Sequence, residues 1–440
     1  TIVTVTITDE NIAEQVTGVY VNSVAASPFG DRKWRAILDG NVPIGIEDIR
    51  LITKETPSPA LRPIIFVHGF AGSAAQFETQ AMRFASNGFP QDYIFALEYD
   101  TSRFPVGQPL NQQELENVGA RLDQLIETVK AKTNADKVDI VAHSLGTRII
   151  AGYLGFPERA AKVARYVAVD GWSGDSPPGG VPTLAIWAEY GTPGRQIGGA
   201  INVTIPKQTH VQVCTSAESF VEMYKFLMGK EPVTAEVVPE DAGHITLAGR
   251  AMVFPQNEGV QNGSLEIWEV DGATGFRVSD RPVAVYTLSG DGSWGPFEAK
   301  PFQHYEFVII REGFADHHFY FEPFIRSDYF IRLLTSGDPT GGVAGYMDRS
   351  DRHMNLVVGR NMEFIGDQEG NNDVLEINGT NIISPTTHPA AKRVNYMFVY
   401  DKDADGNSNL GVPIAYYHQM PFFTGIDLFI PASIPPSGTV

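Results

Sequence analysis

A serine lies between small residues at the junction of an expected strand and an expected helix. Residues 142–146 read Ala-His-Ser-Leu-Gly, and an apolar run leads directly into them. A G-x-S-x-G string in this setting forms a sharp turn that projects the serine hydroxyl away from the sheet. Ala142 takes the place of the first glycine, which exchanges one small residue for another. The chemistry that this arrangement favours is nucleophilic attack by the Ser144 hydroxyl.

A serine nucleophile of this kind needs a base. The expected base is a histidine after the last strand of the sheet, in the chain order serine, acid, histidine. Of the ten histidines, His68 and His143 belong to loops next to expected strands, and seven lie after residue 243, where helical periodicity is lost. His210, which follows the apolar run 201–205, is therefore the predicted general acid and base.

The acid that orients this histidine should end a strand between Ser144 and His210. Asp170 ends an apolar run and is the preferred candidate. Glu189, after the next run, is the alternative, and Asp175 lies further out in a loop rich in proline and glycine. An acid in this position fixes the tautomer of the histidine and stabilises its protonated form.

A second loop supplies candidate hydrogen-bond donors. Residues 64–73 read IIFVHGFAGS, in which an apolar run passes into His-Gly-Phe. In such a turn the backbone N–H of Phe70, together with that of Leu145, is placed to bind the oxyanion of a tetrahedral intermediate. The alternative is that the glycines only form a tight turn.

Strands and helices alternate between Pro63 and about residue 230. One helical segment places apolar residues three and four positions apart between Leu115 and Val129. Alternation of this kind predicts a parallel sheet covered by helices on both faces. The expected strands are Ile64–Val67, Tyr93–Tyr99, Val138–Ala142, Ala164–Asp170, Pro182–Trp187 and Ile201–Ile205.

Four motifs in order, HGFAGS, AHSLG, VAVDGW and THVQVCTS, resemble lipases and carboxylesterases of the α/β-hydrolase fold. The chain is most similar to the archaeal Archaeoglobus-type lipase, which joins a minimal hydrolase domain to a C-terminal β domain implicated in lipid binding. The resemblance extends from about residue 61 to the C-terminus. It implies Ser144, Asp170 and His210 as the catalytic triad, with Phe70 and Leu145 as the oxyanion donors.

The chain of 440 residues divides into three expected parts. Residues 1–56 form a β-rich N-terminal extension, and residues 57–232 form the α/β-hydrolase catalytic domain with about six mostly parallel strands. Residues 233–440 are expected to form a β-sandwich or barrel, because short apolar runs broken by turns are typical of antiparallel sheets. The Gly-rich stretch 337–345 is a candidate division within this region.

These features predict a serine ester hydrolase, either a triacylglycerol lipase or a carboxylesterase, which acts on lipophilic esters and requires no cofactor. A polyesterase or an amidase on the same triad is an alternative, since the fold does not dictate the substrate. A non-catalytic lipid- or glycan-binding module on a degenerate hydrolase scaffold is an alternative from a different class.

The segment 101–113 occupies the place of the lid in the family that the chain resembles. It is short and only modestly apolar. We therefore expect a small increase in rate when an ester substrate passes its solubility limit.

Net charge and chain ends bear on partners and location. The net charge of −19 argues against nucleic acids and anionic membrane surfaces, because both repel an acidic protein. No apolar run approaches the ~18 residues of a membrane span.

The chain starts at Thr1 rather than Met, so we expect that a signal peptide or a tag has been removed. The predicted location is secreted or associated with the cell envelope.

One loop spaces oxygen ligands like the start of a calcium site. Residues 401–409 read DKDADGNSN, and Asp401, Asp403 and Asp405 are the candidate ligands. The twelfth position is Val412 rather than Glu, so the loop is not an EF-hand. A structural calcium ion is one interpretation, and a solvated hairpin loop is the other.

Overall fold

The computed structural model describes residues 16–23, 32–33, 46–53, 61–104, 109–240, 243–338, 343–360, 362–368 and 370–432. The first three segments are the strands β1 (Val16–Ser23), β2 (Arg32–Lys33) and β3 (Ile46–Thr53). They pair antiparallel in the order β2-β1-β3. The other residues of the predicted N-terminal extension lie outside the described part of the chain.

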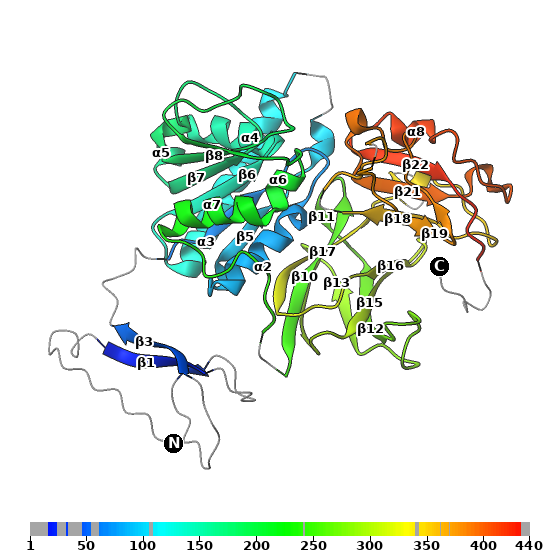
Figure 1. Cartoon of the computed structure of the whole chain (residues 1–440), viewed down its shortest axis with the longest axis horizontal. Coiled ribbons are helices and arrows are strands. Elements are labelled where there is room, and N and C mark those ends of the chain that lie inside the picture. The colour runs from blue at the N-terminus through cyan, green and yellow to red at the C-terminus, as the bar shows by residue number, and fades with distance from the viewer. Residues whose placement is uncertain are drawn as a thin grey trace, which may run out of the picture.

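Six parallel strands form the sheet that carries the predicted site (Figure 1). They lie in the order β5-β4-β6-β7-β8-β9, and β9 is an exposed edge at which the Ile201 side chain is 57% exposed. The predicted α/β fold is confirmed, and no predicted strand differs from the observed one by more than two residues at either end. The strands are β4 (Ile64–Val67), β5 (Ile94–Leu97), β6 (Val138–His143), β7 (Val163–Val169), β8 (Thr183–Ala188) and β9 (Ile201–Ile205).

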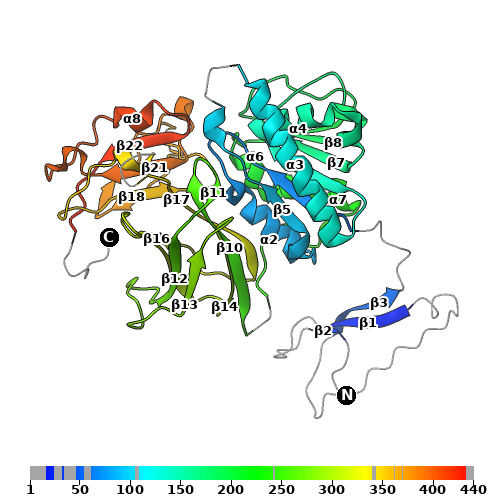
Figure 2. The same ribbon diagram turned by 180° about the vertical axis from the view of Figure 1, so that it is seen from behind.

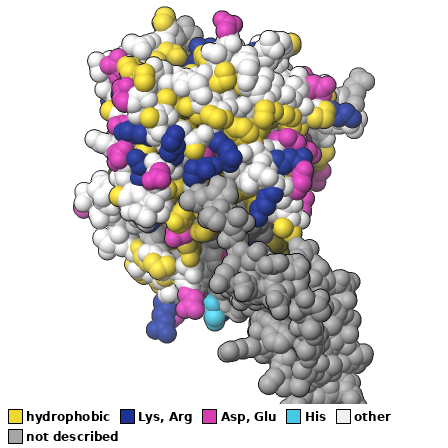
Figure 3. Space-filling model, turned by 90° about the vertical axis from the view of Figure 1, so that its left-hand side faces the viewer, with side chains coloured by type: hydrophobic (Ala, Val, Ile, Leu, Met, Phe, Trp, Pro, Cys, Tyr) yellow, Lys and Arg dark blue, Asp and Glu magenta, His cyan; other side chains and the backbone are white. Residues whose placement is uncertain are grey.

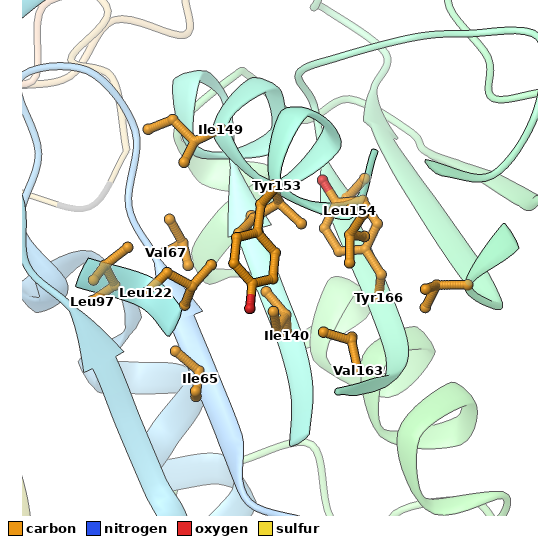
Figure 4. Close-up of a cluster of buried hydrophobic side chains, with 14 of the residues drawn as sticks. Ile65, Val67, Leu97, Leu122, Ile140, Ile149, Tyr153, Leu154, Val163 and Tyr166 are labelled. Atoms are coloured by element: carbon orange, nitrogen blue, oxygen red, sulfur yellow. The ribbon is translucent and has the colours of Figure 1, made fainter. Parts of the chain in front are cut away.

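Helices cover both faces of this sheet because successive side chains of its apolar strands point to opposite faces. On one face, Ile65 and Ile140 pack against Leu122 and Ile149 in the cluster that Figure 4 draws. These helix residues belong to α3 (Gln112–Thr133), which Figure 2 shows running across the back of the sheet, and to α4 (Leu145–Leu154).

The opposite face is covered by α2 (Glu78–Ser86) and α7 (Ala217–Met228). The Phe66 ring of β4 packs there against the rings of Phe77 and Phe84. Two short helices, α5 (Pro157–Ala160) and α6 (Gln212–Thr215), complete the helical part of the domain. Both faces of the sheet are therefore packed mainly with apolar side chains.

Two packed sheets follow the α/β domain and form a β-sandwich. Their shared core contains Leu247 and Ile331 from the first sheet and Ile267 and Phe307 from the second. The first sheet comprises β10 (Ile245–Phe254), β11 (Glu258–Gly259), β14 (Ser293–Ala299) and β17 (Asp328–Ser336). The second comprises β12 (Gly263–Val270), β13 (Ala284–Leu288), β15 (His304–Arg311) and β16 (His317–Tyr320).

One pairing in this sandwich differs from the antiparallel expectation. Strand β17 runs parallel to β10. It follows β16 of the second sheet and crosses back to the first, so its direction is set by the crossing rather than by a hairpin turn. Local turn signals in the sequence do not report such a long-range pairing.

The described residues of 343–432, which we call the C-terminal module, form a smaller unit with its own apolar clusters. Figure 1 shows this module, in orange and red, beside the α/β domain on the side of α6. Its strand β22 also runs parallel to its neighbour β21. Its elements are β18 (Leu356–Gly359), β19 (Glu376–Ile377), β20 (Thr380–Asn381), β21 (Tyr396–Tyr400), α8 (Ala415–His418) and β22 (Phe423–Asp427).

Buried polar contacts join the β-sandwich to the α/β domain. Arg332 of β17 pairs with Glu98 at 2.7 Å, and both side chains are buried. The Asn257 side-chain amide donates to the carbonyl oxygens of Gly72 and Tyr99 at 2.9 and 3.0 Å. Since Gly72 lies two residues after the predicted oxyanion donor Phe70, this hydrogen bond connects the sandwich to the end of that loop.

The surface seen in Figure 3 mixes charges of both signs. Lys and Arg side chains gather there beside hydrophobic ones, with Asp and Glu side chains around them. The excess of acidic residues is therefore not displayed as one uniform patch on this face. Among the residues that the structure describes, no helix is both long enough and apolar enough to cross a membrane.

Candidate active site

Ser144 stands at the turn between β6 and α4, as the residue that caps the helix. Its φ and ψ angles are 52° and −117°, a conformation that L residues rarely adopt. A side chain at Gly146 would place its Cβ 2.6 Å from the carbonyl oxygens of Val67 and His68. The turn therefore requires glycine two residues after the serine, as the motif indicated.

The three residues predicted as a triad are brought together by side-chain hydrogen bonds. His210 Nε2 lies 3.0 Å from Ser144 Oγ, and His210 Nδ1 lies 2.6 Å from Asp170 Oδ2. Asp170 is buried, and the His210 side chain is 13% exposed. The carboxylate of the alternative acid, Glu189, instead accepts a hydrogen bond from the Lys207 N–H at 2.6 Å.

Asp170 is held as a carboxylate by the groups around it. Burial raises the pKa of this carboxyl. The hydrogen bond from His210 and the nearby positive charge of Arg195 lower the pKa by more than burial raises it, so the net shift is downward. Arg195 Nη2 donates to Asp170 Oδ1 at 2.5 Å, and Nη1 donates to the Gly171 carbonyl oxygen at 2.9 Å. Sequence reasoning missed Arg195, because a lone arginine in a Gly-rich loop gives no local signal.

His143 links the serine turn to two other loops. Burial lowers the pKa of its imidazole to about 3, so the ring is neutral near pH 7. Nε2 lies 2.8 Å from the His210 carbonyl oxygen, which only accepts, so the proton is assigned to Nε2. Nδ1 then accepts from the Gln76 amide at 2.5 Å, and Gln76 Oε1 accepts from the Gly69 N–H at 3.2 Å. Sequence reasoning missed Gln76, although it lies close to the HGFAGS motif.

The two predicted oxyanion donors belong to different loops, Leu145 directly after Ser144 and Phe70 in the loop after β4. Leu145 is the first residue of α4, where a backbone N–H has no acceptor within the helix. The Phe70 N–H forms no hydrogen bond with another residue in the described part of the chain. A side chain at Gly69 would bring its Cβ to 3.0 Å from the Ser144 Cβ, so the two loops are in close contact. Both N–H groups therefore remain candidate oxyanion donors.

A pocket of about 460 Å³ opens beside Ser144, Asp170 and His210. This volume lies within the range of about 300–1,000 Å³ for small-molecule sites. The lining residues are Pro109, Leu110, Ser144, Leu145, Arg148, Asp170, Gly171, Arg195 and His210. Residues 105–108 of the segment 101–113 lie outside the described residues, so the small interfacial effect stays a prediction.

The candidate calcium ligands lie in a loop after β21. Asp401 Oδ2 accepts from the Gly406 N–H at 2.9 Å, Asp405 Oδ1 accepts from the Asn407 N–H at 2.8 Å, and Asp403 pairs with its neighbouring lysine. Within the described ranges, no group of three or more His, Cys, Asp or Glu side chains is arranged to hold a metal ion. Calcium binding here stays a prediction.

Comparisons with known protein families match three segments of the chain. The family described as Lipase (class 2) matches residues 61–156, which include Phe70 and Ser144 and end before Asp170 and His210. The family described as Lipase C-terminal domain matches residues 243–338. A further C-terminal domain family matches residues 342–440.

Solved structures that resemble part of the chain share little sequence with it. A predicted CIB-like hydrolase from Thermoplasma acidophilum is 14% identical, with a TM-score of 0.29, over 40% of this chain and 90% of that one. A lipase-esterase related protein from Clostridium acetobutylicum is 11% identical, with a TM-score of 0.28, over 38% and 96%. An esterase from a marine microorganism is 15% identical, with a TM-score of 0.28, over 38% and 95%.

Proposed function

We propose that this chain, a lipase/esterase-type hydrolase with a C-terminal domain, cleaves lipophilic carboxylic esters through an acyl-enzyme on Ser144. The observation that carries the proposal is the continuous hydrogen-bond path from Ser144 through His210 to Asp170 at the floor of a pocket. A serine, a base and a buried acid in this order are what acyl transfer requires.

The first half of the reaction forms the acyl-enzyme. Ser144 Oγ attacks the ester carbonyl carbon while His210 Nε2 accepts the hydroxyl proton, and the carbonyl oxygen becomes an oxyanion. The N–H groups of Phe70 and Leu145 stabilise this oxyanion, each contributing about 2.7–4 kcal/mol. When the intermediate collapses, the C–O bond to the alcohol breaks and His210 gives its proton to the leaving alcohol.

The second half releases the acid and restores the enzyme. His210 accepts a proton from a water molecule, and the resulting hydroxide attacks the acyl carbon. Collapse of the second intermediate breaks the bond to Ser144 Oγ, and His210 returns the proton to that oxygen. Asp170 keeps Nδ1 protonated throughout, so Nε2 is free to act as the base. These steps use only groups of the protein and water, and they require no cofactor.

The proposed substrate is a triacylglycerol or an ester with a medium acyl chain. Support comes from the apolar side chain of Leu110 and the ring of Pro109, which line the pocket next to Ser144. Polyesters and amides are alternative substrates for the same residues, since the fold does not dictate the substrate. We propose a secreted or cell-envelope location, where such insoluble esters are met.

Hydrolysis of nitrophenyl esters from acetyl to stearoyl tests this function. We expect turnover in the native protein, with an optimum at medium or long chains, and loss of turnover in Ser144→Ala. Ser173→Ala is the matched control, because Ser173 stands in the similar string GWSGD on the surface and should leave turnover within about twofold. A native protein inactive on every ester would contradict the proposal and favour a lipid- or glycan-binding module.

A further inference from the structure

A buried carboxylate of the C-terminal module contacts the loop that carries His210. Glu363 Oε1 accepts a hydrogen bond from the Val211 N–H at 3.1 Å, and Glu363 Oε2 accepts one from the Thr209 hydroxyl. The two donors belong to the residues immediately before and after His210. Glu363 is 4% exposed, so water does not compete for these bonds.

A second group from the same module lies against the histidine ring. The Phe422 ring is nearly parallel to the His210 imidazole, with an interplanar angle of 15° and ring centroids 6.3 Å apart. Glu363 therefore binds the backbone N–H after His210 and the side-chain hydroxyl of the residue before it, while the Phe422 ring lies nearly parallel to the imidazole.

Glu363 and Phe422 are parts of one hydrogen-bonded unit. The Asn395 N–H donates to the Phe422 carbonyl oxygen at 3.0 Å, and the Asn395 carbonyl oxygen accepts from the Arg360 N–H at 3.2 Å. The Arg360 guanidinium in turn donates to the Glu363 carbonyl oxygen and forms an ion pair with Asp373 at 2.5 Å. The module thus presents both groups to the histidine loop from a common support.

The energetics favour a role in ordering that loop. A buried carboxylate costs free energy unless hydrogen bonds replace its lost hydration. Both Glu363 oxygens accept from neutral donors of a single loop, so the loop conformation that supplies both donors is selected. Neither Glu363 nor Phe422 lines the pocket beside Ser144, so these groups act on the histidine rather than on bound substrate.

We propose that Glu363 is a positioning residue, which holds His210 in reach of Ser144 and makes the reactive geometry depend on the docked C-terminal module. The inference rests on the proposed function, because it concerns the base of that reaction. Misplacing a catalytic group by about 1 Å lowers a rate by about 100-fold. Loss of Glu363 should accordingly lower kcat and leave KM nearly unchanged.

The test compares kcat and KM of three variants on the best nitrophenyl ester, in full-length protein at a temperature at which all are folded. Glu363→Ala, which removes both acceptors, should lower kcat about 10- to 100-fold with KM within about threefold. Glu363→Gln keeps one carbonyl oxygen and the side-chain shape and should recover most of that loss. Thr387→Ala is the matched control, because buried Thr387 forms its hydrogen bonds within the module only.

Several results would overturn the inference. The first is an unchanged kcat in Glu363→Ala, and the second is a rise in KM without a fall in kcat in that variant. The third is a fall in kcat in Thr387→Ala as large as that in Glu363→Ala. If Glu363→Ala does not fold, Thr209→Val removes one donor and leaves the carboxylate, and an unchanged kcat there would also reject the inference. Native protein that an organophosphonate does not label would instead refute the proposed function, and the inference would fall with it.

Discussion

The His143 ring donates a hydrogen bond from Nε2 to the backbone carbonyl oxygen of His210, at 2.8 Å across 67 residues of sequence. The residue before the proposed nucleophile therefore contacts the loop of the proposed base. Through Gln76, the same ring is connected to the N–H of Gly69, in the loop of the proposed oxyanion donor Phe70. Three loops that must keep a fixed geometry are thus connected by one path of hydrogen bonds, and the α/β domain and C-terminal module hold His210 from two sides.

The choice between the two candidate acids is tested by paired isosteric changes. Asp170→Asn keeps the shape of the side chain but favours the wrong tautomer of His210, and we expect kcat to fall about 10⁴-fold. Glu189→Gln should keep kcat within about threefold, because the Glu189 carboxylate is hydrogen-bonded to the Lys207 N–H rather than to His210. Steady-state ester hydrolysis measures both variants, and the reverse order of effects would assign the acid to Glu189.

Two glycines of α4 should respond in opposite directions to the same substitution. Gly146→Ala places a Cβ 2.6 Å from two carbonyl oxygens and should destabilise the protein by about 1–3 kcal/mol. Gly152→Ala meets no atom within 4 Å and should stabilise it by about 0.5–1 kcal/mol through helix propensity. Denaturant unfolding measures both changes. Equal effects of the two substitutions would contradict the close packing of the serine turn.

Stability should fall at mildly acidic pH through His143. Burial lowers the folded-state pKa of this ring to about 3, while its ordinary value is 6.5. Below pH 6.5 the unfolded chain therefore binds a proton that the folded protein excludes, so the contribution is full above pH 6.5 and is lost as pH falls toward 3. At about 1.4 kcal/mol per pH unit, native protein should lose about 2 kcal/mol more between pH 7 and pH 5 than a variant without this ring.

Unfolding of native protein and His143→Gln by denaturant at both pH values measures that difference. The other histidines whose pKa is lowered, such as His68, His317 and His388, are present in both proteins, so their contributions cancel. A pH dependence identical in the two proteins would show that His143 is protonated as readily in the folded state as in the unfolded one.

The contact between the sandwich and the α/β domain gives a stability prediction of its own. Arg332→Met leaves Glu98 buried without its cation and should destabilise the protein by about 3–5 kcal/mol, whereas the double variant with Glu98→Gln should recover much of the loss. The exposed pair of Lys300 with Glu269 is the control, and Lys300→Met should cost less than about 1 kcal/mol. Thermal unfolding of all four proteins tests this. Similar losses for both single variants would argue against a buried interface.

The sequence predicted the features that depend on local pattern. The six strands of the α/β sheet follow from short apolar runs, and the turn at Ser144 follows from a motif with its own steric logic. Asp170 was preferred over Glu189 from its place at the end of a strand, and the structure brings Asp170 to His210. The expected antiparallel pairing was wrong for β10 with β17, because the strands meet across a crossing between sheets.

Residues whose partners are remote in sequence gave no signal. Arg195 contacts Asp170 from a Gly-rich loop, and Glu363 contacts the histidine loop from 152 and 154 residues away. Neither stands in a motif, and each acts only through a tertiary contact. The local motifs therefore indicated the candidate reacting groups, whereas the residues that contact those groups through the tertiary fold could not be predicted.

The most direct test of the account is covalent labelling of Ser144 by an organophosphonate, followed by mass spectrometry of the intact protein and its peptides. The reagent reports an activated serine whatever ester the enzyme prefers. We predict one adduct per native chain, located on the peptide that contains Ser144, and none in Ser144→Ala. Labelling of His210→Ala should be strongly slowed, because the base is lost. An unlabelled native protein, or an adduct on another serine, would contradict the account.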